Sequence, residues 1–253
     1  MNMKARLFRL RDEVFEINAD RDDYRIVLAL IVMPVLLAIS YYYGKPAYYL
    51  RELKPSATAL LGADFEYLKM LPYAYMSGIL LITRILIPVL IIVYIFKDKL
   101  NEYGWKITGI SKHIPIYFAL YLLCLPFIYI ASLQDSFLNS YPFYRDSMHG
   151  GWHFWAYEAV YMIQFACVEA FFRGFLLFVL FRKFGYYAVL ILLTPYCMIH
   201  FGKPFPEVIA SILTGAILGF LALRTGSFYL GAVLHMGVAF TMDIAALYQK
   251  GYL

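Results

Sequence analysis

Residues 166–175 read ACVEAFFRGF, an apolar stretch that carries one acid, Glu169, and one base, Arg173. The two residues are four positions apart, so on a helix they lie on one face. Ionisable residues inside a membrane span are costly, usually face the protein interior, and by default indicate a functional site. A salt bridge that only holds a neighbouring helix is the simpler alternative. The stretch therefore predicts a membrane helix that carries either a functional polar site or a structural salt bridge on one face.

The composition of the whole chain is that of a membrane protein. Of its 253 residues, 62% are hydrophobic and 19% are aromatic, whereas soluble domains are about 45–50% apolar even when glycine is counted. The formal charge of +5 says little about partners, because the cytoplasmic loops of membrane proteins are basic in general. The sequence carries no nucleic-acid-binding signature, and the lipid bilayer is the expected partner. The three cysteines lie in apolar segments and predict no disulfide framework.

Hydropathy predicts an all-α fold, a polytopic transmembrane helical bundle of about seven spans. About 20 apolar residues cross a bilayer, and longer apolar stretches tilt. The fifth expected span is the shortest. The spans are expected at residues 26–43, 72–96, 114–132, 154–181, 186–200, 207–223 and 228–248.

A basic segment, residues 1–25, precedes the first span. Leu7, Leu10, Val14 and Ile17 recur at helical spacing beside several arginines, which predicts a short amphipathic helix on the membrane surface; a plain basic anchor is the alternative. With the N-terminus inside, the inside segments hold 13 Lys and Arg and the outside segments hold 7, which predicts a cytoplasmic N-terminus. We therefore expect an integral, multi-pass protein of a bacterial-type inner membrane.

The chain is expected to have three parts: the segment 1–25, three accessory transmembrane helices in residues 26–132, and a four-helix core in residues 154–248. Within the core, Ser211, Gly215 and Gly219 recur every four residues. Small residues on one stripe let helix backbones approach closely in lipid. This stripe predicts a tight seam against the fifth or the seventh helix.

The last span carries a second polar stripe. Gly231, His235, Ala239 and Asp243 share one helix face, which should border protein or a water-filled cavity rather than lipid. An alternative for Asp243 is that its side chain reaches the nearby membrane surface. His200 ends the fifth span, where an interfacial position is the alternative to a place in the site.

Another ionisable residue, Arg84, lies near the centre of the second span. A buried guanidinium in a membrane needs an anionic partner. Glu169 and Asp243 are both candidates, and the sequence does not choose between them.

These residue types point to hydrolytic chemistry. A carboxylate and a histidine in a wet cavity inside the membrane activate water by general-base catalysis, and a second histidine stabilises an oxyanion. Glu169, His200 and His235 are the candidates, with Arg173 beside the acid. Zinc bound by His200, His235 and Glu169 is an alternative, but the chain lacks the paired-histidine helix of zinc proteases, so we expect no cofactor.

The same residues resemble the motifs of a known family. The chain has Glu-Ala-Phe-Phe-Arg-Gly at 169–174, Tyr-Cys-Met-Ile-His at 196–200 and His-Met-Gly-Val-Ala at 235–239, in that order on three helices. They are similar to the motifs Glu-Glu-x-x-x-Arg, Phe-x-x-x-His and His-x-x-x-Asn of the CPBP family, also called Abi, of CAAX-prenyl-protease and bacteriocin-processing membrane proteins. The stretch Glu-Tyr-Gly-Trp at 102–105 is also familiar for this family. The core resemblance covers residues 154–248.

The resemblance implies a glutamate-type intramembrane endopeptidase that cleaves peptide bonds near a membrane surface. In the family scheme, the first Glu and the first His activate water, the second His and the Asn bind the oxyanion, and the second Glu and the Arg support the first Glu. It thereby implies Glu169, Arg173, His200 and His235 as site residues, and a membrane protein or a lipid-linked peptide as the substrate.

The chain departs from the motifs at two positions that carry the chemistry. Val168 stands where the first Glu is expected, and Ala239 stands where the Asn is expected. Three accounts remain open. The chain is an active variant in which Glu169 becomes the base and Asp243 or Glu207 compensates, a catalytically inactive homologue that binds a membrane substrate or partner, or an accessory subunit of a membrane complex.

Overall fold

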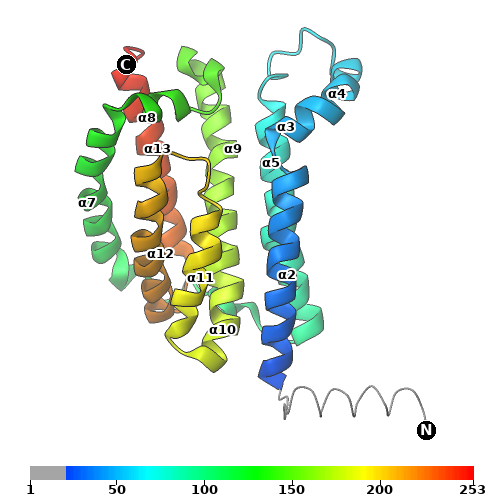
Figure 1. The fold of residues 1–253 in the computed structure, drawn as a ribbon, viewed down its shortest axis with the longest axis vertical. Helices are drawn as coiled ribbons and strands as arrows, with labels where there is room; N and C mark the ends of the chain where they lie inside the picture. Colours follow the sequence, from blue (N-terminus) through cyan, green and yellow to red (C-terminus); the bar gives the residue numbers. More distant parts are fainter. Residues whose placement is uncertain (1–20) are drawn as a thin grey trace.

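The computed structural model describes residues 21–253, which form helices joined by short loops, with no β-strand in this range (Figure 1). Six helices are long and apolar enough to cross a membrane, which confirms the all-α, multi-pass expectation. They comprise Asp22–Tyr43, Leu71–Phe96, Ser111–Ser132, Gly151–Phe184, Phe205–Thr225 and Tyr229–Gln249. The amphipathic helix was expected within residues 1–25. Residues 1–20 of this segment lie outside the described part of the chain.

Several of these spans are composed of consecutive helical elements. The second contains α5, η2, α6 and η3, and the fourth contains α9, η7 and α10; η2, η3 and η7 are π-helical turns within them. The elements are α2 (Arg21–Tyr43), α3 (Pro46–Tyr48), η1 (Tyr49–Leu53), α4 (Lys54–Leu61), α5 (Leu71–Leu81), η2 (Ile82–Leu86), α6 (Ile87–Leu90), η3 (Ile91–Phe96), η4 (Leu100–Tyr103), η5 (Ser111–His113), α7 (Ile114–Ser132), α8 (Asp135–Ser140), η6 (Arg145–His149), α9 (Gly151–Glu169), η7 (Ala170–Leu176), α10 (Leu177–Phe184), α11 (Tyr187–Met198), α12 (Phe205–Thr225) and α13 (Tyr229–Gln249).

The fifth expected span is shorter than the other six. Helix α11 has 12 residues, which is about 18 Å of helix against a hydrocarbon core of about 30 Å. Helix α11 ends at Met198, and residues 199–204, which include His200, form a loop that leads to α12. Hydropathy did not reveal this break because Ile199 and Phe201 continue the apolar run into the loop. The consequence is that His200 lies on a loop inside the bundle.

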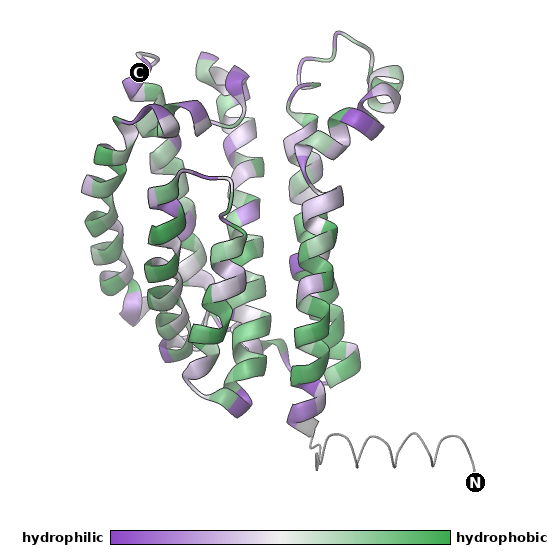
Figure 2. Cartoon of the chain, viewed as in Figure 1, coloured by the Kyte–Doolittle hydropathy of each residue, from purple (hydrophilic) through white to green (hydrophobic). Residues whose placement is uncertain are grey.

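The helices stand side by side with their polar residues at the two ends. Figure 2 shows hydrophobic residues along the middle of the bundle and hydrophilic residues mainly at its two ends. Helix α2 begins at one end of the bundle and α13 finishes at the other (Figure 1). Helix α9 packs against α5 on one side and α13 on the other, and α7 packs on the outer side of α13. Helix α9 is thus the central element around which the site is built.

The seam predicted from the small residues of α12 lies against α11. A Cβ atom added at Gly219 would lie 2.7 Å from Cγ1 of Val189, and one added at Gly215 would lie 2.9 Å from Cδ1 of Tyr196. Both distances are shorter than van der Waals contact, so the two helices approach as closely as they do only because these positions lack side chains. This agrees with the first of the two expected partners, the fifth helix.

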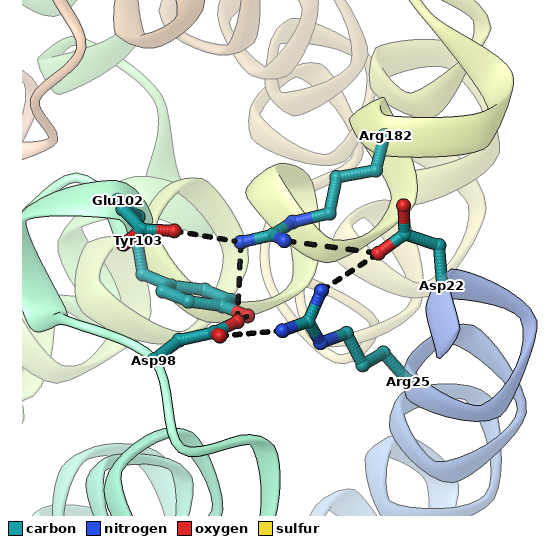
Figure 3. Close-up of polar contacts among 6 residues, drawn as sticks. All are labelled: Asp22, Arg25, Asp98, Glu102, Tyr103 and Arg182. Carbon is teal, nitrogen blue, oxygen red and sulfur yellow. Dashed lines mark hydrogen bonds and ion pairs between the residues drawn. The ribbon is translucent and has the colours of Figure 1, made fainter.

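A cluster of charged residues joins α2 to the core at one end of the bundle (Figure 3). Arg182 of α10 lies between three acids, with its guanidinium nitrogens 3.3 Å from Asp98 and Glu102 and 3.7 Å from Asp22. Arg25 of α2 pairs with Asp22 at 2.8 Å and also with Asp98. These contacts fix the start of α2 against the end of α10, although the two elements are far apart in the sequence.

The loop that supplies two of these acids is itself anchored in the core. Tyr103 is fully buried and donates a hydrogen bond of 2.6 Å to Asp98. Burial, followed by this hydrogen bond, raises the pKa of Tyr103 above its ordinary value. Trp105 packs edge-on against Phe228, with ring centroids 5.0 Å apart. The Glu-Tyr-Gly-Trp stretch therefore closes one end of the bundle below the fourth and last spans.

Candidate functional site

Glu169 is the last residue of α9 and is completely buried. The helix changes there from α-helical to π-helical geometry, because η7 begins at the next residue. Such π-helical turns are rare in proteins as a whole, and those that occur are often found at functional sites. Gly174, within η7, lets a loop approach closely, since a Cβ atom there would lie 3.2 Å from the backbone oxygen of Tyr103.

One carboxylate oxygen of Glu169 receives two charged or polar neighbours. Its Oε1 is 3.2 Å from Nη1 of Arg173 and 2.9 Å from Nδ1 of His235. The first contact is within one helix, as the four-residue spacing predicted, and the second joins α9 to α13. The other oxygen, Oε2, is buried and has no hydrogen-bond partner. A Cβ atom at Gly231 would lie 3.5 Å from Oε2, so the glycine leaves this side of the carboxylate uncrowded.

Arg173 connects the acid to the other two helices of the core. Its Nη2 donates to the backbone oxygen of Gly215 on α12 at 3.3 Å. Its guanidinium carbon lies 3.7 Å from the centre of the Tyr196 ring on α11, which is a cation–π contact. Arg173 is itself buried. A single side chain thus bridges the fourth span, α11 and α12 around the carboxylate.

His200 packs against Tyr196 of α11. Its Nδ1 is 2.8 Å from the backbone oxygen of Tyr196, and the two rings are 4.9 Å apart. Its ring interacts electrostatically with both Glu169 and His235.

The hydrogen bonds assign the same tautomer to both histidines. A backbone carbonyl only accepts, so Nδ1 of His200 carries the proton and donates it to Tyr196. An ionised carboxylate also only accepts, so Nδ1 of His235 donates to Glu169. In each ring Nε2 is left for another partner. Glu169 and His235 are thus in direct contact, whereas His200 contacts Tyr196, so the convergence of all three residues stays a prediction.

Apolar packing surrounds Val168 and Ala239, the two positions at which the chain departs from the motifs that it resembles. Val168 is buried in the main hydrophobic cluster, together with Phe171 and Phe172 of the next turn. Ala239 is buried beside Tyr161 and Phe165 of α9. The residues packed against them in these two clusters are aliphatic or aromatic. This packing favours the non-catalytic accounts.

Neither of the two residues expected to compensate has a contact with Glu169. Glu207 accepts hydrogen bonds from Lys203 at 2.5 Å and from the hydroxyl of Tyr141 at 2.6 Å. Asp243 is fully buried, which rules out the alternative that it reaches the membrane surface. Its neighbour is the carboxyl group of Glu158 on α9, within hydrogen-bonding reach. A compensating role for Asp243 or Glu207 stays a prediction.

Glu158 is the member of this region that the sequence reasoning missed. It is only 4% exposed, and none of the four carboxyl oxygens of Glu158 and Asp243 has a hydrogen-bond donor of normal geometry among residues 21–253. The buried hydroxyl of Tyr157, next to them, is also unbonded. Glu158 precedes Glu169 by eleven residues, close to three helical turns, so the periodicity of α9 was a signal that both acids lie on one face.

The donor set around Glu169 does not fit a zinc ion. Within residues 21–253 no group of three or more His, Cys, Asp or Glu side chains is arranged to hold a metal. Oε1 of Glu169 and Nδ1 of His235 bond to each other, and the cation Arg173 bonds to the same oxygen. A metal ion would have to displace these contacts and lie beside a guanidinium. The arrangement is that of a hydrogen-bonded acid and imidazole.

Comparison with known proteins finds a similarity in the core. Residues 150–241 match a family model described as "Type II CAAX prenyl endopeptidase Rce1-like". The match spans the fourth span, α11, α12 and most of α13, and includes Glu169, Arg173, His200 and His235. The resemblance inferred from the three motifs is thereby confirmed. Searches of curated proteins and of solved structures found no significant match.

Proposed function

We propose that the chain is an intramembrane endopeptidase in which Glu169, His200 and His235 act on a peptide bond near the membrane surface, because residues 150–241 match the Rce1-like family model. The family match and the spans support a membrane-embedded protease fold. The observation that carries the proposal is the hydrogen bond of 2.9 Å between Glu169 and His235, which joins two helices at a fully buried carboxylate.

In the proposed reaction, water attacks the carbonyl carbon of the scissile peptide bond. The free Nε2 of His200 accepts the proton of the water, and the unpaired Oε2 of Glu169 orients it. The proton then passes to the nitrogen of the leaving amine as the C–N bond breaks. Arg173 holds Glu169 in its ionised form and in position.

His235 serves the oxyanion in this scheme. Glu169 accepts from its Nδ1, which fixes the orientation of the ring. A proton on Nε2 then lets the ring donate to the negatively charged oxygen of the tetrahedral intermediate. Ala239 has no hydrogen-bond donor in its side chain. Among the motif residues, His235 is therefore the side chain that can donate a hydrogen bond to the oxyanion.

The second candidate function is binding without catalysis, as an inactive homologue that serves as a binding, scaffold or accessory subunit of a membrane complex. The apolar packing around Val168 and Ala239 favours it. In that case Glu169, Arg173 and His235 form a structural ion cluster that holds four helical elements together. The substrate in the first case, and the partner in the second, would be a membrane protein or a lipid-linked peptide.

Cleavage assays on the purified protein in liposomes separate the two candidates. Wild type and the variants Glu169→Gln, His200→Ala and His235→Ala are incubated with a panel of membrane-inserted and lipid-linked peptides, and products are identified by mass spectrometry. We expect cleavage by wild type and a loss of about a hundredfold or more in each variant. His113→Ala, a histidine outside the core, is the matched control and should cleave as wild type does. Equal rates in wild type and all three site variants exclude the endopeptidase.

We also propose that the protein lies in a bacterial-type inner membrane with its N-terminus in the cytoplasm. The excess of Lys and Arg in the predicted inside segments supports this orientation. Single cysteines placed near residue 64 and near residue 108, in loops at opposite ends of the bundle, test it in intact cells. A membrane-impermeant thiol reagent should label the first and not the second; the reverse pattern would invert the orientation.

A further inference from the structure

Arg84 is a buried cation for which the described part of the protein supplies no anion. It lies on η2, and its side chain is 92% buried, being 8% exposed. Its Nε has no hydrogen-bond partner. The groups that interact with the guanidinium electrostatically are the thiol of Cys167 and the hydroxyl of Tyr196. Neither group is ionised under ordinary conditions, so the positive charge stands uncompensated.

Both carboxylates expected to pair with Arg84 have other partners. Glu169 is bonded to Arg173 and His235. Asp243 lies beside Glu158, in the C-terminal part of α13. The expectation that one of the two acids neutralises Arg84 is therefore not met.

The surroundings of Tyr196 consequently carry a net positive charge. Arg84 and Arg173 both interact with this tyrosine, and so do the carboxylates of Glu169 and Glu207. Glu207 is paired with Lys203, so Arg84 and Arg173 against Glu169 leave one positive charge in an apolar interior. An uncompensated charge in a membrane is strongly unfavourable, and a residue that stays in this state is by default functional. The site therefore has the charge to receive one anionic group.

The depth of Arg84 restricts what can bring that anion. The residue is 13 positions from Leu71 and 12 from Phe96, the ends of its span, which is about 18–20 Å along a helix. Headgroup phosphates lie at the membrane surface, about 15 Å or more from the centre of the hydrocarbon core. An anion that reaches Arg84 must accordingly be carried on an apolar chain. A carboxylate fits, because the planar guanidinium fork binds it through two parallel hydrogen bonds.

We propose that Arg84 is a binding residue for a carboxylate carried on an apolar, membrane-embedded chain, held beside Tyr196 at the edge of the Glu169 site. The chain is either that of a peptide or that of a fatty acid, since both present the same carboxylate. Binding requires no cleavage, so the inference applies to both candidate functions. It assigns to Arg84 a role in ligand recognition, distinct from the chemistry at Glu169.

Binding to the purified protein in liposomes tests the proposal. The probes are a fluorescent apolar single-span peptide with one mid-span Glu, the same peptide with Gln, oleic acid, and oleyl alcohol as its uncharged counterpart. Wild type should bind the Glu peptide or oleic acid at least about tenfold more tightly than the uncharged counterpart, which is the scale of a charge-assisted pair. The arm that shows the preference identifies the source of the carboxylate. No preference in either arm overturns the proposal.

Variants at the site show whether the preference depends on Arg84. Arg84→Gln should abolish the preference for the carboxylate, and Arg84→Lys should retain part of it because the charge remains. Cys167→Asp places an internal carboxylate beside Arg84 and should weaken binding of the charged probe without removing the arginine. Cys124→Ser, on α7, is the control and should bind as wild type does. A preference that persists in both Arg84→Gln and Cys167→Asp contradicts the proposal.

Thermal unfolding without any probe supplies an independent readout. An arginine that only holds the fold together lowers the melting temperature when it is replaced, whereas removal of an uncompensated buried charge does not. We expect Arg84→Gln to melt at or above the temperature of wild type. A melting temperature well below that of wild type assigns Arg84 a structural role and overturns the proposal, whatever the outcome of the cleavage assays.

Discussion

Helices α9 and α13 hold two buried acidic sites that differ in how their charge is balanced. At the first, Glu169 meets His235 and is neutralised by Arg173 from its own helix. The second site lies about 16 Å closer to the start of α9. There Glu158 lies beside Asp243, and no cation bonds to either carboxyl group. The two sites share a helix pair and are separated by an aromatic layer that includes Tyr161 and Phe165.

The difference shows what a buried carboxyl group requires. A cation allows Glu169 to remain ionised inside the bundle, where it can polarise a histidine or orient water. Without a cation, two facing carboxyl groups are stable only if they share a proton, which makes them a hydrogen-bonded pair instead of two charges. The first site therefore suits chemistry or charged ligands, and the second suits helix packing.

Replacement of Arg173 should have the largest effect on this comparison. Arg173→Met leaves Glu169 as an unpaired buried charge apart from His235, and also removes the bridge to Gly215 and Tyr196. Breaking a buried ion pair in this way costs about 3–5 kcal/mol of stability. Urea or thermal unfolding in detergent measures it. The double variant with Glu169→Gln should recover part of the loss; a single variant as stable as wild type would show that Glu169 is not ionised.

Restoring the missing amide should have the next largest effect, on rate instead of stability. Ala239→Asn places a hydrogen-bond donor one turn from His235, and one oxyanion donor is worth about a hundredfold or more in kcat. Peptide cleavage in liposomes measures the gain, with Ala246→Asn, a buried alanine further along α13, as the matched control. A folded Ala239→Asn protein whose rate does not rise above that of wild type favours the non-catalytic account.

The smallest effect is expected at the second acidic site. Asp243→Asn keeps the shape of the side chain and supplies N–H donors to Glu158, so stability should change by no more than about 1 kcal/mol. Infrared difference spectroscopy of Asp243→Asn and Glu158→Gln against wild type should show the loss of a protonated-carboxyl band. A loss of several kcal/mol, or the absence of such a band in wild type, would mean that the pair is held by charge and not by a shared proton.

Much of the site was accessible from the sequence because its signals are local. The four-residue spacing of Glu169 and Arg173 predicted their contact, and the stripe from Gly231 to Asp243 predicted the inward face of α13. The spacing of small residues on α12 predicted a close helix seam. Each of these patterns arises within one helix, where 3.6 residues per turn decides which side chains share a face.

Other features depend on how helices from distant parts of the chain are placed. The break after α11 was hidden because apolar residues continue into the loop, so hydropathy extended the span to His200. Glu158 drew no attention because its partner lies 85 positions later in the chain. The charged cluster of Figure 3, which joins α2 to α10 through Arg182, is equally non-local.

The sequence by itself determined that this protein is a multi-pass helical membrane protein, that its core resembles the CPBP family, and which residues enter the core as ionisable groups. Only the tertiary structure decided which partner each ionisable group has. Glu169 contacts Arg173 and His235, and Glu158 and Asp243 lie beside each other. Arg84 has no anionic partner among the described residues. The physical reason is that hydropathy and helical periodicity are properties of a segment. Charge compensation is a property of the space between segments, and in a membrane interior it decides what each group can do.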